Sequence, residues 1–213
     1  ALKNTPPTPF RVPPGIKTAY APMPEQEEYG TSHISIVDGA GNALAMTTTI
    51  GSVFGSRLFV RGFLLNNQLT DFSFTPRDDE GKPVANRVEP GKRPRSSMSP
   101  LLVSDKASGK VVITGGSPGG ALIIHYTAKT LYGMLHWGLN AQQAINLPNV
   151  ASLNGPTLLE EKRFPRSTRD ALKARGHEVK EVSLPSGLHV IERTRDGWFG
   201  GADPRREGDV KGD

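Results

Sequence analysis

A glycine followed by a threonine marks the first place where this sequence could carry chemistry. Gly30-Thr31 lies where a proline-rich stretch gives way to alternating β-branched residues. A threonine hydroxyl is a weak nucleophile unless a base lies beside it, and the α-amine of a threonine that begins a chain can be that base. Cleavage before Thr31 would create such an amine. Threonine is also common at the start of ordinary strands, so the position alone does not decide between the two interpretations.

A pair of glycines offers a second chemical function. Gly119 and Gly120 follow Ser117-Pro118, between an apolar run and a segment with helical periodicity. Two amides without side chains at a helix N-terminus can point at a developing oxyanion, and the helix dipole favours negative charge there. A plain strand-to-helix turn uses the same residue types, so this motif is also ambiguous when taken alone.

Two polar segments could hold the charged ends of an α-amino acid. Ser96 and Ser97 lie among basic residues, a setting that suits a carboxylate. Asn67, Gln68 and Asp71 follow an apolar run and suit an ammonium group. Each segment alone is also what an ordinary polar loop contains.

The composition limits the class of protein. A 36% hydrophobic content over 213 residues fits a globular chain with one sizeable core. The net charge is +5, but the basic residues are dispersed and no aromatic ribbon accompanies them, so we expect no nucleic-acid partner. No apolar run reaches the roughly 18 residues of a membrane-spanning helix. The chain has no cysteine, which excludes a thiolate nucleophile, and we expect neither a metal nor a cofactor.

The elements that must position these residues follow from hydrophobic periodicity. Strands come first, then helices, then strands again, which favours a layered α+β sandwich over alternating βαβ units. Residues 74–95 form a polar loop. The predicted strands are 31–37 and 43–50 around the turn 38–42, 63–65, 101–103 paired with 111–113, 179–182, 187–193 and 197–201. The predicted helices are 122–135, 141–146 after the N-cap Asn140, and 167–175 before Gly176.

Taken in this order, the motifs resemble the small subunit of the γ-glutamyltranspeptidases, and the resemblance covers nearly all of the chain from Thr31 to Arg206. The serine-serine-methionine and glycine-serine-proline-glycine-glycine blocks together are highly specific. The matching text is Thr31-Ser32-His33, Val37-Asp38, Gly41-Asn42, Thr47-Thr48-Thr49, Phe54-Gly55, Leu64-Leu65-Asn66-Asn67-Gln68, Asp71-Phe72, Lys92-Arg93-Pro94-Arg95-Ser96-Ser97-Met98-Ser99-Pro100, Gly116-Ser117-Pro118-Gly119-Gly120 and Asp203-Pro204-Arg205.

The resemblance implies an N-terminal-nucleophile hydrolase with an αββα sandwich, of which this chain carries part. It also implies self-cleavage at Gly30-Thr31 and transfer of a γ-glutamyl group from glutathione or related amides to water, an amino acid or a peptide. The implied catalytic residues are Thr31 as nucleophile, Thr49 as the hydroxyl that orients it, and Gly119 and Gly120 as the oxyanion hole. The implied substrate-binding residues are Gln68 and Asp71 for the α-amino group, Ser96 and Ser97 for the α-carboxylate, and Asn67 beside them.

The resemblance also divides the chain and supplies a partner. Residues 1–30 are expected to be the end of the large subunit, an extended arm before the cleavage point, and residues 31–213 the catalytic small subunit. The partner is then the large subunit of the same precursor, which carries the family's donor-carboxylate arginine. An intact Gly30–Thr31 bond would lock the threonine amine in an amide, so the uncleaved chain would be inactive. A periplasmic or secreted location is implied by the family alone.

Three departures from the family pattern keep alternatives open. Gly51 stands where many members carry an asparagine that contacts the donor. The segment 56–61 is short and carries two arginines, and the loop 74–90 lacks a lid tyrosine. An open pocket would admit bulkier acyl donors, so a glutaryl-cephalosporin-type acylase is one alternative. A fragment with a structural role is the other. In either enzyme we expect the Thr31 and Thr49 hydroxyls to lie close, with the glycine pair facing Thr31 across a cleft.

Overall fold

The computed structural model describes Ala21 and residues 30–212. The predicted arm therefore lies outside the described residues, except for Ala21 and Gly30. Ala21 is buried and pairs with the polar loop 74–95, where its N–H donates to the Pro83 carbonyl at 2.9 Å. No helix among the described residues has the length and apolar content that crossing a membrane requires.

The chain opens with the predicted β-hairpin. Strands β1 (Thr31–Val37) and β2 (Ala43–Thr49) pair antiparallel, with Thr31 opposite Thr49. The Asp38 carboxylate organises the turn, because its Oδ1 accepts hydrogen bonds from the backbone N–H groups of Ala40 and Asn42 at 2.9 and 2.8 Å. A five-residue turn between two strands with alternating side chains favours a single pairing register. The observed pairing of β1 with β2 confirms the hairpin prediction.

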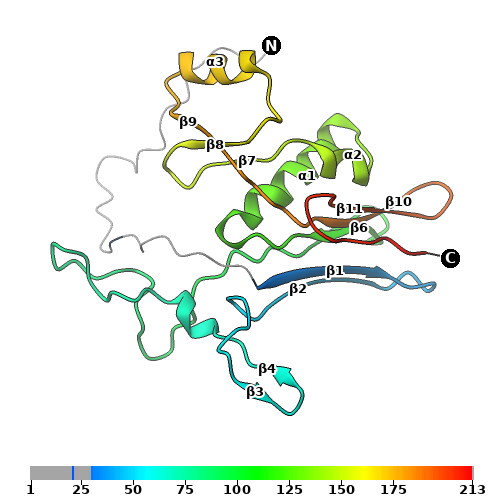
Figure 1. Cartoon of the computed structure of the whole chain (residues 1–213). Coiled ribbons are helices and arrows are strands. Elements are labelled where there is room, and N and C mark those ends of the chain that lie inside the picture. The colour runs from blue at the N-terminus through cyan, green and yellow to red at the C-terminus, as the bar shows by residue number, and fades with distance from the viewer. Residues whose placement is uncertain (1–20, 22–29, 213) are drawn as a thin grey trace.

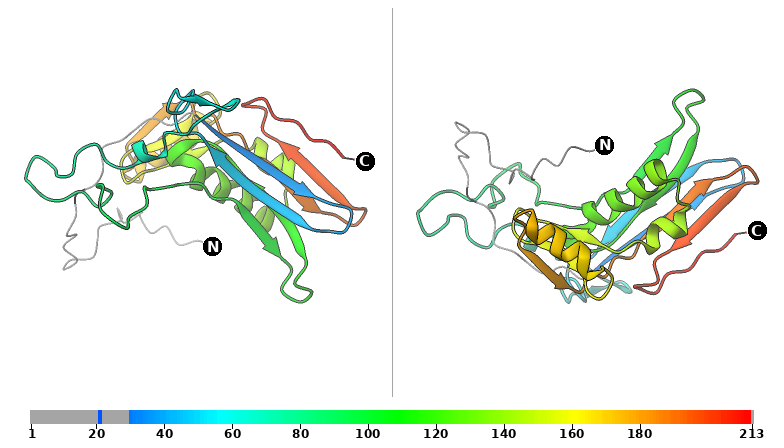
Figure 2. Two further views of the ribbon diagram at one scale, coloured as in Figure 1. Left: turned by 90° about the horizontal axis from the view of Figure 1, so that it is seen from below. Right: turned by 90° about the horizontal axis from the view of Figure 1, so that it is seen from above.

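A four-stranded sheet forms the second layer, in the order β11-β10-β6-β5. The inner face of the hairpin packs against β6 and β10 of this sheet. Figure 1 and the two views of Figure 2 show the hairpin on one side of the sheet and helices on the other. The strands are β5 (Leu101–Ser104), β6 (Val111–Gly116), β10 (His189–Arg193) and β11 (Trp198–Ala202).

Helices α1 (Ile123–Trp137) and α2 (Ala141–Asn146) cover the outer face of the four-stranded sheet (Figure 1). Asn140 caps α2 as predicted, with its side chain accepting from Gln143 N and the Gln143 side chain bonding back. The core lies between these helices and the sheet. It contains Ile113, Tyr126, Met134, Ile145, Leu188 and Val190 among others.

A small α/β unit departs from the prediction. Strands β8 (Thr157–Glu160) and β9 (Val179–Val182) are parallel and are joined through α3 (Arg166–Ala174), so one βαβ unit is present after all. The prediction missed β8 and its two-residue partner β7 (Val150–Ala151). Strands this short show too little alternation to be recognised in a sequence.

A second short hairpin was missed for the same reason. The predicted strand at 63–65 is β4 (Phe63–Leu64), and it pairs with β3 (Phe59–Val60). A single 3₁₀ turn, η1 (Gln68–Asp71), follows it and carries two of the predicted substrate-binding residues. The β3–β4 hairpin projects away from the layered body in Figure 1.

Candidate active site

The two threonine hydroxyls meet at the open end of the first hairpin. Thr31 Oγ1 donates to Thr49 Oγ1 at 3.0 Å, which confirms the predicted contact. Thr49 Oγ1 in turn donates to the Gly30 carbonyl at 3.3 Å and accepts from Gly51 N at 2.9 Å. Because a hydroxyl has one proton, this pattern fixes the direction of the chain of bonds, from Thr31 through Thr49 to the Gly30 carbonyl.

The Gly30 carbonyl receives a second hydrogen bond. Ile50 N donates to it at 3.0 Å, and Gly30 N donates to the Gly51 carbonyl at 2.7 Å. The peptide bond before Thr31 is therefore held as an extension of the β1–β2 ladder. Two donors on one carbonyl oxygen withdraw electron density from its carbon, which is the atom that a neighbouring hydroxyl would attack.

The inner face of the hairpin is polar beside Thr31. His33 is 4% exposed, and its Nδ1 and Nε2 lie 2.8 Å from Thr47 Oγ1 and 3.1 Å from Ser35 Oγ. Burial, and secondarily the charge of His189, lower the pKa of His33 to about 4. A Cβ atom added to Gly116 at the end of β6 would lie 2.4 Å from the ring of His33. The absence of a side chain at Gly116 therefore lets β6 approach β1 next to Thr31.

Protonation of His33 should destabilise the fold. The pKa of this residue is about 4 when folded and 6.5 as a free group, so the unfolded chain binds more protons between these values. The stability contribution is complete above pH 6.5 and is lost as the pH falls toward 4, by about 3 kcal/mol. Urea unfolding at several pH values should show this slope, and His33→Gln should flatten it. The same change at His136, which is exposed, should not.

The predicted ammonium anchor is a buried carboxylate. Asp71 is 7% exposed, and Gln68 Nε2 bonds to its Oδ2. Burial raises the pKa of Asp71, while the Arg95 charge and the Gln68 bond oppose that shift. The anchor is tied to the hairpin, because Asn67 N donates to the Ile50 carbonyl at 3.1 Å. A cationic group that binds here would add a positive charge beside the buried carboxylate and would offset the cost of burying it.

Asn86 links the two predicted anchors, and sequence reasoning missed it. Its Nδ2 donates to the Asp71 carbonyl at 2.6 Å, and its Oδ1 accepts from Arg95 N at 3.1 Å. The residue after Arg95 begins the pair Ser96 and Ser97, of which Ser96 is exposed and Ser97 half-buried. The sequence signal was only an asparagine in a polar loop, which gave no reason to select it.

Asn67, whose predicted substrate-binding role stays a prediction, makes hydrogen bonds within the site. Its Oδ1 accepts from Ser52 N at 2.9 Å and its Nδ2 donates to Thr70 Oγ1 at 2.9 Å. A Cβ atom on Gly51 would lie 2.0 Å from Asn67 Oδ1. The Asn67 side chain therefore occupies the space beside Gly51 and ties the strand end to η1.

The glycine turn starts where β6 meets His33. Ser117 and Gly120 are buried and Gly119 is half-buried, at φ 136°, with φ 56° at Gly120. Both angles lie in the region that favours glycine. Side chains at alternate strand positions share a face, so Thr31 lies on the same inner face of β1 as His33. The turn therefore follows β6 on the side of the hairpin that carries Thr31, and the expectation that both glycine amides face Thr31 across a cleft stays a prediction.

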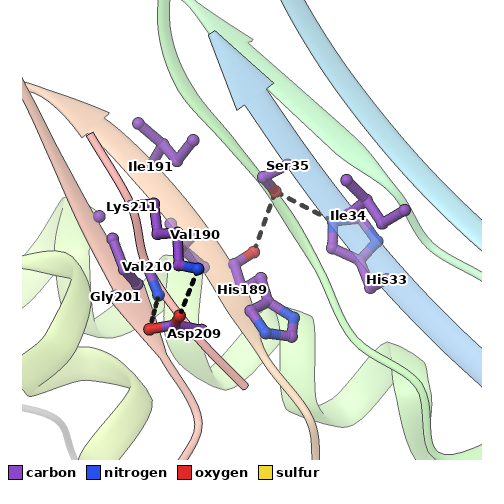
Figure 3. A pocket seen from close by; sticks show the side chains of 11 residues that line it. His33, Ile34, Ser35, His189, Val190, Ile191, Gly201, Asp209, Val210 and Lys211 are labelled. Atoms are coloured by element: carbon purple, nitrogen blue, oxygen red, sulfur yellow. Dashed lines mark hydrogen bonds and ion pairs between the residues drawn. The ribbon is translucent and has the colours of Figure 1, made fainter. Parts of the chain in front are cut away.

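A cavity of about 280 Å³ lies elsewhere, between β1, β10 and the C-terminal residues 209–211 (Figure 3). Its polar lining includes His33, Ser35 and His189, and Ser35 Oγ donates to the His189 carbonyl at 3.2 Å. None of the residues predicted to bind substrate lines it. No cluster of three or more histidine, aspartate or glutamate side chains that could hold a metal occurs in the part of the chain that the structure describes.

Comparison with known proteins decides the family. Residues 3–213 match the family model of γ-glutamyltranspeptidase. The chain belongs to the γ-glutamyltranspeptidase family. It is 37% identical over 196 residues to the glutathione hydrolase proenzyme of Escherichia coli, covering 86% of this chain and 33% of that protein. The chain thus spans about a third of the length of this relative.

Solved structures confirm the fold class of an N-terminal-nucleophile hydrolase, present here in part. A mutant γ-glutamyltranspeptidase from Helicobacter pylori superposes with a TM-score of 0.72 at 31% identity, covering 82% of this chain and 99% of that one. A cephalosporin acylase from Bacillus halodurans gives a TM-score of 0.71 at 25% identity, covering 92% of this chain and 36% of the acylase. The hairpin, the four-stranded sheet and the pair α1–α2 are the layers of that fold found among the described residues.

Proposed function

We propose that the protein to which this chain belongs transfers γ-glutamyl groups from glutathione and related amides to water or to amino compounds, with Thr31 as nucleophile. The observation that carries the proposal is the bonded series from Thr31 through Thr49 to the Gly30 carbonyl. A strand-initiating threonine without a catalytic task needs neither a hydroxyl partner nor a polarised carbonyl before it. The glutathione hydrolases among the relatives supply the substrate class.

Self-cleavage is the first reaction that this geometry supports. Thr31 Oγ1 attacks the Gly30 carbonyl carbon, and the bond from that carbon to the Thr31 nitrogen breaks. The hydroxyl proton passes to the nitrogen, which becomes a free amine, and an ester joins Gly30 to the Thr31 oxygen. Water then hydrolyses the ester, which leaves a Gly30 carboxylate and restores the hydroxyl. Ile50 N and Thr49 Oγ1 stabilise the oxyanion of this step from their places on the Gly30 carbonyl.

Transfer is the second reaction. The freed amine of Thr31 takes the hydroxyl proton while Oγ1 attacks the γ-carbonyl of the donor. The Gly119 and Gly120 amides stabilise the oxyanion, and collapse expels the leaving amine with the proton. Water or an amino compound then takes the acyl group from the ester. Asp71 with Gln68 holds the donor's ammonium end, and Ser96 with Ser97 holds its carboxylate, so the donor is fixed at one end while it reacts at the other.

A large subunit completes the molecule in this proposal. The outward face of the hairpin carries Ile34, Ile36, Leu44 and Met46, which are 40–49% exposed, while the inward face is polar. Apolar side chains on the outside of a sheet require cover. The bacterial relative is a proenzyme of which this chain matches 33%, whereas the solved H. pylori chain is covered over 99% of its length. Both facts support a second chain, cut from the same precursor, as the cover.

The experiment that tests the proposal uses the complete precursor. It should give two bands on a denaturing gel that co-elute in native buffer, and the pair should release the chromophore from a γ-glutamyl anilide. Turnover of glutaryl-cephalosporin instead of the anilide would replace the proposal with the acylase alternative. A processed pair that turns over neither substrate would contradict both.

A further inference from the structure

A buried polar cluster that the proposed chemistry does not use lies behind the glycine turn. Its centre is Asp203, which is 1% exposed. Asp203 Oδ2 accepts hydrogen bonds from Ser186 Oγ at 2.5 Å and from Leu188 N at 3.2 Å. Asp203 Oδ1 accepts from Arg205 N and Arg205 Nη1, both at 3.0 Å. The carboxylate thus joins the loop before β10 to the chain after β11.

Arg205 anchors this centre to the rest of the fold. Its Nε and Nη2 donate to the two carboxylate oxygens of Glu160, each at 2.7 Å, so the pair is bidentate. It also donates to the carbonyls of Ile145 and Leu147 at the end of α2, at 3.1 and 3.0 Å. A buried ionic cluster adds less stability than well-packed apolar side chains of similar volume often would. We therefore look for its role in orientation, because each hydrogen bond fixes the direction of the two groups that it joins.

The cluster reaches the turn through two neighbouring residues. Ser186 bonds to Asp203, and the next residue, Gly187, donates its N–H to Ser117 Oγ at 3.1 Å. Ser117 Oγ donates onward to the Pro118 carbonyl at 2.7 Å. A Cβ atom on Gly187 would lie 2.7 Å from the Pro118 ring, so the loop rests directly on the turn. These contacts connect Asp203 to the two residues that precede Gly119.

The other side of the turn is held by Tyr126 of α1. A Cβ atom on Gly119 would lie 2.5 Å from the Tyr126 ring, and Tyr126 is 1% exposed. The turn is therefore enclosed between a buried aromatic ring and the loop that the Asp203 cluster holds. A pair of amides serves as an oxyanion hole only when its directions are set before the reaction, within roughly 0.5 Å.

We propose that Asp203, Arg205 and Glu160 are positioning residues that set the direction of the Gly119 and Gly120 amides, with Ser186 and Ser117 as the connecting hydroxyls. The inference rests on the proposed function, since it presumes that these amides receive the oxyanion. It assigns a task to the Asp203-Pro204-Arg205 motif, which the catalytic scheme leaves without one. The cluster acts through the turn and touches no substrate.

The test removes the connecting hydroxyl and leaves both glycines in place. Ser117→Ala in the complete precursor should lower kcat for a γ-glutamyl anilide by about tenfold or more, because oxyanion donors act on the transition state. KM should stay within about twofold, since the donor's charged ends are held elsewhere. Two-band processing should persist, because the Gly30 carbonyl has its own donors. Ser117→Thr keeps the hydroxyl and should recover most of kcat.

Ser108→Ala is the matched control, because Ser108 Oγ also bonds to a neighbouring group, at 2.7 Å from Asp105, but lies on the exposed β5–β6 turn. It should leave kcat unchanged. Asp203→Asn should lower kcat as Ser117→Ala does, and the double variant should lose less than the product of the single losses if both act on one turn. If the parent is active and Ser117→Ala leaves kcat unaltered, this inference alone is overturned. The same holds if KM rises by as large a factor as kcat falls. A parent without anilide turnover would instead overturn the proposed function.

Discussion

Replacing Thr31 with alanine in the complete precursor should abolish self-cleavage and γ-glutamyl transfer together. In the proposed mechanism both reactions use the Thr31 hydroxyl oxygen, which donates to Thr49 Oγ1 at 3.0 Å beside a carbonyl that accepts two hydrogen bonds. Alanine removes the nucleophile and leaves the β1–β2 backbone ladder intact. A denaturing gel should show one band in place of two, and anilide turnover should fall to background.

Thr31→Ser supplies the matched comparison. Serine keeps the nucleophilic oxygen and loses the methyl group that restricts χ1, so its hydroxyl spends less time aimed at Thr49. Processing should be slower and turnover lower than in the parent, but both should remain detectable. Complete processing of Thr31→Ala would show that another residue attacks, and a Thr31→Ser variant as inert as alanine would show that the hydroxyl is not what matters.

The hairpin that begins at Thr31 could be predicted because its signals are local. Alternating side chains, one turn and a register that one-residue slippage would invert all agree on Thr31 opposite Thr49. Within the βαβ unit, α3 and β9 were predicted, but β8 was not, because its four residues show no alternation of apolar and polar types. Without β8, the parallel pairing of β8 with β9 could not be predicted. The hairpin's apolar outer face also escaped prediction, since alternation alone does not say which side is covered.

The residues of the candidate site also fall into two groups, those with a local sequence signal and those without one. Thr31, Asp71 and the glycine pair stand in motifs whose residue types suggest chemistry, so a sequence can nominate them. Asn86 sits in an unremarkable polar loop, and its two hydrogen bonds to the Asp71 carbonyl and Arg95 N exist only once that loop has folded. The Gly187–Ser117 bond joins residues 70 apart and has no counterpart in any local pattern. Contacts of this kind are therefore found from coordinates, whereas the candidate reacting residues were selected by the resemblance of their motifs to a known family.

Replacing Asp71 with alanine should leave processing intact and weaken donor binding. The Asp71 carboxylate is buried and bonded to Gln68, but it makes no bond to the Gly30–Thr31 segment among the contacts of the described residues. In the proposed site, its loss removes the partner of the donor's ammonium group, an interaction worth about 1.5–3 kcal/mol, or one to two decades in affinity. The increase should appear in KM for a γ-glutamyl anilide, with two bands on the gel as in the parent.

The matched control is Asp79→Ala, which removes the same charge from an exposed position in the loop that follows. It should change neither processing nor KM, so a general effect of net charge is separated from the local one. An Asp71→Ala variant with unchanged KM would remove this residue from the donor site and favour an acyl donor without an ammonium group, of which a glutaryl amide is the simplest. Failure of processing in Asp71→Ala would show instead that η1 supports the cleavage geometry, through the Asn67 N bond to the Ile50 carbonyl.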